Sequence, residues 1–262
     1  MRRTCRSCSS AARCRWLNTS ECRVQGISDP CGLVDSLLAQ PLLAVLRPAT
    51  IEAARRQLES LQAVGLVHVE LAVEASRAWS QGCLSLAAAF PALRLGAASV
   101  TAADQLEAVA EGGLAYAVSP IFDPELLLRA RQLGLTLVPG VQSPTEVHQA
   151  QRLGCSIVKL FPARPLGPGY WASLAGPLGP LPFCIAAGGL ACADVLPWLE
   201  QGVDAVALGG RLFGPPGLAV DQDQDQDQGN ANGSLDQAPG PLDPGLAGLV
   251  RKLAGRAHQR LH

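Results

Sequence analysis

Short apolar runs alternate with amphipathic segments along most of the chain. From residue 42 onward the starts of these runs are separated by 20 to 27 residues. A short apolar run bounded by turn residues is typical of a strand that is buried on both faces. The sequence predicts eight such strands, at Leu42–Leu46, Val67–Leu71, Leu93–Ala97, Ala115–Val118, Thr136–Val138, Ser156–Leu160, Phe183–Ala186 and Ala205–Leu208.

The segments between the runs have the polar and apolar spacing of helices, as in Ile51–Leu58 and Thr145–Ala150. Eight strands that alternate with helices predict an α/β protein, a (β/α)8 TIM barrel. Residues Leu33–Ala39 precede the first strand, and we expect them to form a short N-terminal helix that caps the bottom of the barrel. An open Rossmann-like sheet is the alternative, but no GxGxxG motif follows the first strand and the even spacing favours closure.

The pattern divides the chain into four parts. Residues 1–30 have five arginines in the first fifteen positions and no apolar periodicity, so we expect a disordered Cys/Arg-rich tail. Residues 31–213 form the predicted barrel domain. Residues 214–241 contain Asp-Gln repeated four times and cannot bury apolar area, which predicts a disordered low-complexity insertion. Residues 242–262 return to a helical pattern and are the predicted final barrel helix, with Asp243 and Pro244 at its start.

Composition narrows the class of protein. A net charge of −1 and a pI near 6.4 give no sign of a general affinity for nucleic acid or anionic membranes. No apolar run approaches the length that spans a bilayer, so we expect a soluble protein with a small-molecule partner. The nine cysteines are odd in number and unevenly spread, which favours a reducing compartment and a cytoplasmic location. Cys5 and Cys8 form a CxxC pair without a second pair at zinc-ligand spacing, so we expect no metal.

One lysine lies inside a predicted strand. The chain has two lysines, Lys159 and Lys252, and its other basic residues are arginines. Burial of an ammonium group is costly unless the charge is used or neutralised. A desolvated lysine with a lowered pKa can attack a carbonyl group and form a Schiff base, whereas arginine stays protonated. The alternative is a lysine that extends from the strand end to solvent.

Other candidate groups follow the carboxyl ends of the predicted strands, where TIM barrels place their active sites. A guanidinium, a carboxylate, a hydroxyl and two glycine pairs would meet Lys159 at one mouth. Taken singly, each has a structural explanation: Arg47 and Glu70 would pair, and glycine pairs often form turns. Taken together, with glycine turns suited to a phosphate, they predict a phosphorylated keto-acid substrate. The groups are Arg47, Glu70, Ser99, Lys159, Gly188-Gly189 and Gly209-Gly210.

Nine short motifs over residues 33–213 resemble the 2-keto-3-deoxy-6-phosphogluconate (KDPG) aldolase and 4-hydroxy-2-oxoglutarate (KHG) aldolase family, in order and at natural spacing. The last helix resembles it more loosely. The motifs are Ala44-Val45-Leu46-Arg47, Val69-Glu70, Gly96-Ala97-Ala98-Ser99-Val100, Val118-Ser119-Pro120, Pro139-Gly140-Val141, Val158-Lys159-Leu160-Phe161-Pro162-Ala163, Gly167-Pro168, Ala187-Gly188-Gly189 and Gly209-Gly210.

The resemblance implies a class I aldolase without metal or cofactor, a homotrimer that reversibly cleaves KDPG to pyruvate and glyceraldehyde 3-phosphate. It implies that Lys159 forms the Schiff base and that Glu70 is the general acid and base. Arg47 would hold the keto-acid carboxylate, and Ser99 stands where the family has threonine. The remaining implied contacts are Phe161 to the pyruvyl part and Gly188, Gly189, Gly209 and Gly210 to the phosphate.

Four positions depart from the family pattern and concern substrate choice. Ala98 replaces a glycine and is expected to restrict the turn there. Ala187 lacks a hydroxyl that some members have. Glu74 would repel an anionic substrate if it faced inward, and Arg211 would either strengthen phosphate binding or cover the mouth.

Several functions stay open at this point. Cleavage of KHG to pyruvate and glyoxylate, or of the 6-phosphogalactonate analogue, is an alternative activity of the same site. A barrel that binds a sugar phosphate without turnover is an alternative from another class, although retention of Lys159 in a lysine-poor chain argues against it. A third alternative is a phosphate-binding isomerase or synthase of similar size, and the Lys159 motif is what distinguishes an aldolase from such an enzyme.

Overall fold

The computed structural model describes residues 31–210, 212–214 and 240–259. The expected tail 1–30, Arg211, residues 215–239 of the expected insertion and the last three residues of the expected final helix lie outside the described residues. In chain order the elements are α1 (Leu33–Ala39), β1 (Leu42–Leu46), α2 (Ile51–Ala63), β2 (His68–Ala72), α3 (Arg77–Ala89), β3 (Arg94–Ala98), α4 (Ala103–Glu111), β4 (Tyr116–Val118), α5 (Pro124–Gln132), β5 (Thr136–Val138), β6 (Gly140–Val141), α6 (Pro144–Arg152), β7 (Ile157–Leu160), η1 (Arg164–Leu166), α7 (Tyr170–Ser173), α8 (Ala175–Leu178), β8 (Phe183–Ala187), η2 (Cys192–Asp194), α9 (Val195–Glu200), β9 (Ala205–Leu208) and α10 (Leu246–Gln259).

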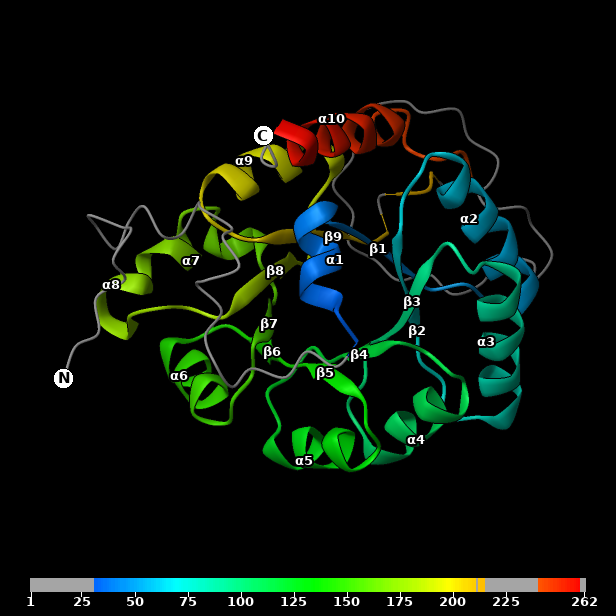
Figure 1. Cartoon of the computed structure of the whole chain (residues 1–262), viewed down its shortest axis with the longest axis horizontal. Coiled ribbons are helices and arrows are strands. Elements are labelled where there is room, and N and C mark those ends of the chain that lie inside the picture. The colour runs from blue at the N-terminus through cyan, green and yellow to red at the C-terminus, as the bar shows by residue number, and fades with distance from the viewer. Residues whose placement is uncertain (1–30, 211, 215–239, 260–262) are drawn as a thin grey trace.

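The strands form one parallel sheet in the order β5-β4-β3-β2-β1-β9-β8-β7-β6, which curls into a barrel surrounded by helices (Figure 1). The predicted TIM barrel is therefore confirmed. The structure has nine strands over the described residues where the sequence predicts eight, because Pro139 divides the fifth strand. Proline has no N–H to donate, but the Pro139 carbonyl still accepts the Lys159 N–H at 2.8 Å. As β5 pairs with β4 and β6 with β7, the two pieces together close the ring.

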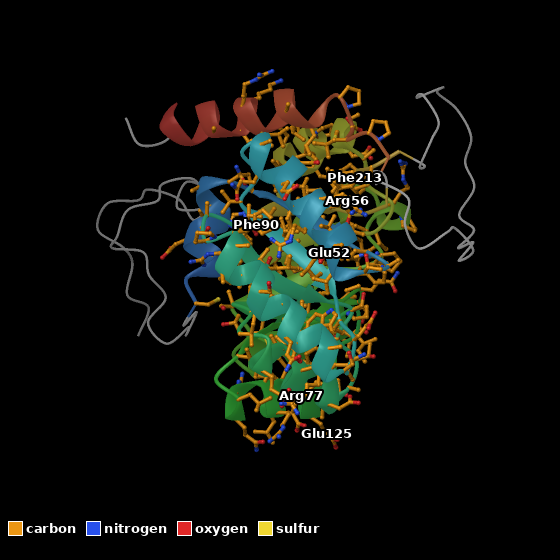
Figure 2. The ribbon with its side chains drawn as sticks, turned by 90° about the vertical axis from the view of Figure 1, so that its right-hand side faces the viewer. Glu52, Arg56, Arg77, Phe90, Glu125 and Phe213 are labelled. Carbon is orange, nitrogen blue, oxygen red and sulfur yellow. The ribbon has the colours of Figure 1, made fainter. Side chains whose placement is uncertain are left out.

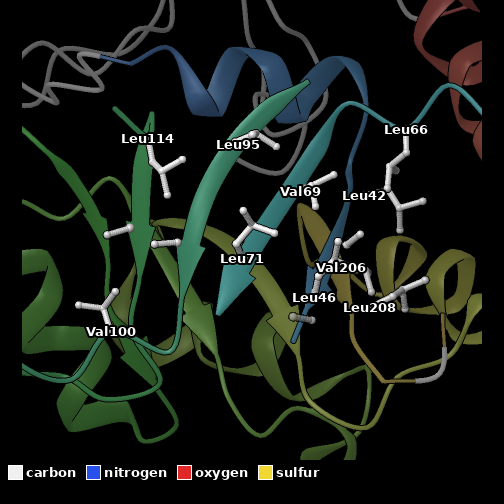
Figure 3. Packing of buried hydrophobic residues seen from close by; sticks show 14 of the residues in the cluster. Leu42, Leu46, Leu66, Val69, Leu71, Leu95, Val100, Leu114, Val206 and Leu208 are labelled. Atoms are coloured by element: carbon white, nitrogen blue, oxygen red, sulfur yellow. The ribbon is translucent and has the colours of Figure 1, made fainter. Parts of the chain in front are cut away.

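The strands are apolar along their whole length because both faces are covered. In β1, Leu42, Ala44 and Leu46 belong to the hydrophobic cluster between the sheet and the outer helices (Figure 3). Leu43 lies in a second cluster, inside the barrel, and Val45 packs against it. Alternation along a strand thus points successive side chains to opposite covered faces, and a polar residue on the inner face is enclosed.

Helix α1 closes the bottom of the barrel, as predicted. Leu33 and Leu37 are fully buried in the inner cluster, and Figure 1 shows α1 lying across the middle of the ring. Gly32 precedes the helix with a φ of 62°, a left-handed conformation that glycine adopts without strain. The Arg94 guanidinium donates a 2.6 Å hydrogen bond to the Cys31 carbonyl beside it. The open mouth is therefore at the carboxyl ends of the strands.

Four of the outer helices begin at a polar N-cap residue. The side chains of Thr50, Ser76, Asp123 and Ser143 accept backbone N–H groups at the starts of α2, α3, α5 and α6. Figure 2 looks onto α2 and α3, with Glu52 and Arg77 labelled near their starts. Between β7 and β8 only the short η1, α7 and α8 occur, because prolines and glycines interrupt this stretch.

Helix α10 lies between α9 and α2 in Figure 1, the place of an eighth barrel helix. Leu246, Leu249, Val250 and Leu253 face the outer cluster. The helix starts at Leu246 rather than at the expected Asp243–Pro244. Asp243 instead accepts the Gly245 N–H in a turn before it. None of the helices in the described part of the chain is long and apolar enough to cross a membrane.

Candidate active site

Lys159 lies on the inner face of β7, and its side chain is only 6% exposed. Its neighbours in register are Gly140 on β6 and Ile185 on β8. Burial lowers the pKa of the Lys159 amine because it disfavours the charged form; the Glu70 charge opposes this and the Arg47 charge adds to it. A lowered pKa increases the neutral, nucleophilic fraction of the amine near neutral pH.

Glu70 lies on the inner face of β2 and is 1% exposed. Burial raises the pKa of its carboxyl group to about 7, while the positive charges of Lys159 and Arg47 act in the opposite direction. Neither carboxylate oxygen has a hydrogen-bond partner among the described residues. A carboxyl group with a pKa near 7 exchanges protons readily at neutral pH, which is the property that a general acid and base requires.

Arg47 and Ser99 meet on the rim of the mouth, in the segments that follow β1 and β3. The Arg47 Nη2 donates to the Ser99 Oγ at 3.4 Å. Ser99 has a φ of 65°, the left-handed region that non-glycine residues seldom adopt. Ala98 is the last residue of β3 and pairs with Ala72. The expectation that Ala98 restricts the turn is therefore wrong, because the turn begins at Ser99.

The Phe161 ring lies near both the Lys159 amine and Gly188 of the first glycine pair. The Lys159 Nζ lies 4.8 Å from the centroid of the Phe161 ring. The ring also packs against Gly188, where an added Cβ would lie 3.0 Å from the ring. Gly188 also has a φ of 101°. Glycine is required there both by its backbone conformation and by the approach of Phe161.

The two glycine pairs have different surroundings. Gly189 has a φ of 76°, and its carbonyl accepts the Arg164 Nε–H at 2.5 Å. Arg164 is also 3.5 Å from Asp194, a partly exposed ion pair that contributes little stability. Gly209 and Gly210 follow β9, which lies between β8 and β1, and an added Cβ at either would meet nothing within 4 Å. The second pair is thus open on the rim between the first pair and Arg47.

The remaining departures fall at different depths. Ala187 is buried at the end of β8, next to the first glycine pair. Glu74 is exposed after β2, so it does not line the barrel interior. Arg211 lies outside the described residues.

A cavity of 350 Å³ lies at the ends of β4, β6 and β7, and Lys159 is not among its lining residues. Its lining includes Phe161, Pro162, Ile121 and Gln142. A larger hollow of 490 Å³ lies between α3 and α4 on the outside of the barrel, far from the amine in the fold. We assign the chemistry to the mouth, because the titratable groups converge there. The described residues contain no group of three or more histidine, cysteine, aspartate or glutamate side chains placed to hold a metal ion.

Sequence reasoning did not select Tyr116, which is fully buried inside the barrel on β4. In the sequence it resembles an ordinary core aromatic within an apolar run. Gly96, at the matching position of β3, was the available signal, because a glycine inside a strand often marks the close approach of another group.

Comparison with known proteins identifies the family of the chain. A family model described as "Aldolase: KDPG and KHG aldolase" matches residues 34–228. The 2-dehydro-3-deoxy-6-phosphogalactonate aldolase of Escherichia coli (strain K12) is 29% identical over 174 residues, which cover 66% of this chain and 84% of the relative.

A 2-dehydro-3-deoxy-phosphogluconate aldolase of Treponema pallidum (strain Nichols) is 33% identical over 135 residues, covering 45% of this chain and 64% of that protein. Among solved structures, the 2-keto-3-deoxy-6-phospho-gluconate aldolase of Zymomonas mobilis ATCC 29191 superposes with a TM-score of 0.60 at 26% identity, covering 66% of this chain and 84% of that one. With the family model matching most of its length, the chain belongs to the KDPG and KHG aldolase family, whose members are carbon–carbon lyases.

Proposed function

We propose that this chain is a class I aldolase that reversibly cleaves KDPG to pyruvate and glyceraldehyde 3-phosphate through a Schiff base on Lys159. The observation that carries the proposal is the pairing of two buried titratable groups inside one barrel. Lys159 has a lowered pKa and Glu70 a raised one. Groups whose environments move their pKa values toward neutrality are typical of acid–base and nucleophilic catalysis.

The reaction begins with attack of the neutral Lys159 Nζ on the C2 carbonyl carbon of the substrate, which gives a carbinolamine. Protonated Glu70 donates its proton to the C2 hydroxyl, so that water leaves and a protonated imine forms. Both steps need a carboxyl group that is close to half-protonated at the working pH, as a pKa of about 7 provides.

The imine then serves as the electron sink for cleavage. Ionised Glu70 takes the proton of the C4 hydroxyl, the C3–C4 bond breaks, and its electron pair moves into an enamine on C2 and C3. The aldehyde product leaves from the C4 side. Protonated Glu70 returns its proton to C3 of the enamine, which gives the imine of pyruvate. Addition of water to this imine releases pyruvate and regenerates the amine, so that atoms and charges balance over the cycle.

Arg47 and Ser99 are suited to the carboxylate end of the substrate. The Arg47 guanidinium is exposed at the rim and bonded to Ser99, which restricts its orientation. A guanidinium binds a carboxylate through two parallel hydrogen bonds and fixes the plane of the adjacent carbonyl. The Phe161 ring, 4.8 Å from the amine, provides an apolar wall for the pyruvyl carbon atoms.

The glycine pairs are suited to the phosphate end. Gly188 and Gly189 both have a positive φ, and Gly209 and Gly210 have open space beside them. Backbone without side chains permits an anion to approach the N–H groups closely. The two pairs follow the neighbouring strands β8 and β9, the position where many barrels bind phosphate.

The test is reductive trapping. The full chain is incubated with pyruvate and sodium borohydride, digested and mapped by mass spectrometry. We expect one N-(1-carboxyethyl) adduct on Lys159 and none on exposed Lys252, which serves as the internal control. Absence of an adduct, or an adduct on Lys252 alone, would refute the Schiff-base mechanism.

A second candidate substrate is 2-keto-3-deoxy-6-phosphogalactonate, the C4 epimer. The relatives named for it in Escherichia coli and Rhizobium meliloti are each 29% identical to this chain and are each covered over 84% of their length. We expect the gluconate to have the larger kcat/KM, and KHG, which lacks the phosphate, to be cleaved much more slowly. A larger kcat/KM for the galactonate would assign that substrate instead, and equal rates for KHG would remove the phosphate role of the glycine pairs.

The proposal includes a homotrimer, which the family resemblance implies, and a cytoplasmic location, which the cysteine content favours. The chain has a mass of 27.3 kDa, so light scattering on the purified protein is expected to give three times that value. A monomer mass that persists at high protein concentration would refute the trimer.

A further inference from the structure

The phenol ring of Tyr116 extends across β3 toward Glu70. In the sheet register Glu70 on β2 pairs with Gly96 on β3, and Gly96 pairs with Tyr116 on β4. An added Cβ on Gly96 would lie 2.5 Å from the Cε2 and Cζ atoms of Tyr116. These atoms belong to the hydroxyl-bearing end of the ring. The absent side chain of Gly96 therefore leaves the space through which the hydroxyl reaches toward β2.

Both ends of this arrangement are buried and unpaired. Tyr116 is fully buried, and its hydroxyl has no hydrogen-bond partner among the described residues. Glu70 is 1% exposed, and neither of its carboxylate oxygens has a hydrogen-bond partner among the described residues. An unpaired polar atom in an apolar interior is destabilising, because it has lost its hydrogen bonds to water without replacement. The Tyr116 hydroxyl, a donor, and the two Glu70 oxygens, which are acceptors, thus lie in one layer of the barrel interior without partners.

We propose that Tyr116 is a positioning residue for Glu70, and that its hydroxyl donates a hydrogen bond, direct or through one water molecule, to the ionised carboxylate. This inference rests on the role of Glu70 in the proposed function. The hydrogen bond would satisfy the phenol and one carboxylate oxygen together. It would also restrict the rotation of the Glu70 side chain, which Lys159 and Arg47 influence only by their charges.

The phenol is suited to act as a permanent donor. Burial raises the pKa of Tyr116 well above its usual value, and Coulombic interactions with Glu70 and Cys31 act in the same direction while Arg94 opposes them. The hydroxyl therefore keeps its proton while Glu70 titrates. A donor to the ionised form lowers the pKa of a carboxyl group, so Tyr116 would limit the rise that burial causes.

The groups that face this pair come from several elements. Lys159 on β7 and Arg47 after β1 act on Glu70, and Arg94 on β3 and Cys31 before α1 act on Tyr116. All of them stay in place when Tyr116 is changed to phenylalanine. The change therefore removes one hydroxyl group and leaves the surrounding charged groups as they are.

The test is the titration of Glu70 in the full chain without substrate. Infrared difference spectroscopy follows the carbonyl stretch of the protonated carboxyl, identified as the band that Glu70→Gln removes. For Tyr116→Phe we expect the midpoint to rise by about one pH unit, the effect of a hydrogen bond to a charged group. The acid limb of kcat/KM against pH is expected to move by the same amount. Tyr170→Phe is the matched control, because the Tyr170 hydroxyl donates instead to the Gln142 carbonyl, and its midpoint is expected to stay at the wild-type value.

A second measurement keeps the inference testable if Tyr116→Phe does not fold. The chain has two tyrosines, so Tyr170→Phe produced with 3-fluorotyrosine carries the label at Tyr116 alone. The fluorinated phenol is the more acidic and so the stronger donor, and we expect the Glu70 midpoint to fall. A midpoint that does not move in either protein would overturn the inference and leave Tyr116 as a packing residue.

Failure of the proposed function is distinguishable from failure of this inference. The infrared titration needs no turnover and no adduct. If pyruvate trapping failed while the Glu70 midpoint still responded to Tyr116, the hydrogen bond would stand and the aldolase mechanism would fall. If trapping succeeded and the midpoint did not respond, the opposite would hold.

Discussion

Replacement of Glu70 by glutamine is expected to make the fold more stable and the enzyme nearly inactive. The change keeps the shape of the side chain and removes only its ability to ionise. General acid–base groups contribute roughly 10²- to 10⁴-fold to rate, and we expect kcat to fall by that amount. The gain in stability follows from the cost of an ionised carboxylate inside the barrel.

The magnitude follows from the pKa of Glu70, which is 4.5 for an unperturbed glutamate side chain and about 7 in the folded protein. Because the folded form holds the proton more tightly, its stability is highest below pH 4.5. It is lost as pH rises from 4.5 to 7, by about 1.4 kcal/mol per pH unit. The total is about 3 kcal/mol, and it is constant above pH 7. Glutamine stays neutral throughout and avoids this loss.

The assay is urea unfolding of both proteins at pH values from 4 to 8, followed by fluorescence. We expect the two free energies of unfolding to agree at pH 4 and to differ by about 3 kcal/mol at pH 8, with the variant more stable. Glu74→Gln is the control, because Glu74 is an exposed carboxylate on the same rim. Its difference from wild type is expected to show no comparable dependence on pH.

The outcome that would refute the reasoning is a difference that stays flat between pH 4 and pH 8 for Glu70→Gln. Such a result would mean that Glu70 is hydrated in solution, or that Lys159 neutralises it fully. A variant that becomes less stable as pH rises would refute the sign of the argument.

Three further expectations concern the mouth of the barrel. The acid limb of kcat/KM against pH should lie near pH 7, the pKa of Glu70, and a limb near pH 4.5 would contradict the buried carboxyl. Arg47→Lys keeps the positive charge but loses the two parallel hydrogen bonds that a guanidinium makes to a carboxylate. The KM for KDPG in a steady-state assay should therefore rise about tenfold with kcat little changed. An unaltered KM would exclude Arg47 from carboxylate binding. Gly188→Ala should lower the free energy of unfolding by about 1–3 kcal/mol, because φ is 101° and the new Cβ would meet Phe161 at 3.0 Å. Gly176→Ala, with nothing within 4 Å of its added Cβ, should be neutral or slightly stabilising in the same denaturation assay, and equal losses in the two variants would contradict this account.

The strands were predictable because the inner and outer faces of the sheet are both apolar. Observed strand starts such as Leu42, Thr136 and Phe183 coincide with the predicted ones. The division at Pro139 was not predicted, because an apolar run does not reveal which residue lacks a donor in the ladder. The connection from β7 to β8 was also not predictable in detail, since its prolines permit several short helical turns.

The convergence of Lys159 and Glu70 was predictable, because parallel strands direct their carboxyl ends to one side of a barrel. The contact of Phe161 with Gly188 was not, since it depends on the path of the chain after β7. Tyr116 was not predicted from the sequence for a related reason. Tyr116 differs from an ordinary core aromatic residue only in its register with Gly96 and Glu70. The sequence alone does not reveal that register.

The placement of the two lysines has a practical consequence for peptide mapping. Lys159 is enclosed in the barrel and Lys252 is exposed on α10. An endoproteinase specific for lysine therefore has two peptide bonds to cut in the whole unfolded chain. An alkylated Lys159 resists that enzyme, so modification would merge the first two fragments into one that ends at residue 252. The ratio of merged to separate fragments would report the occupancy of a single side chain without isotope labels or substrate analogues.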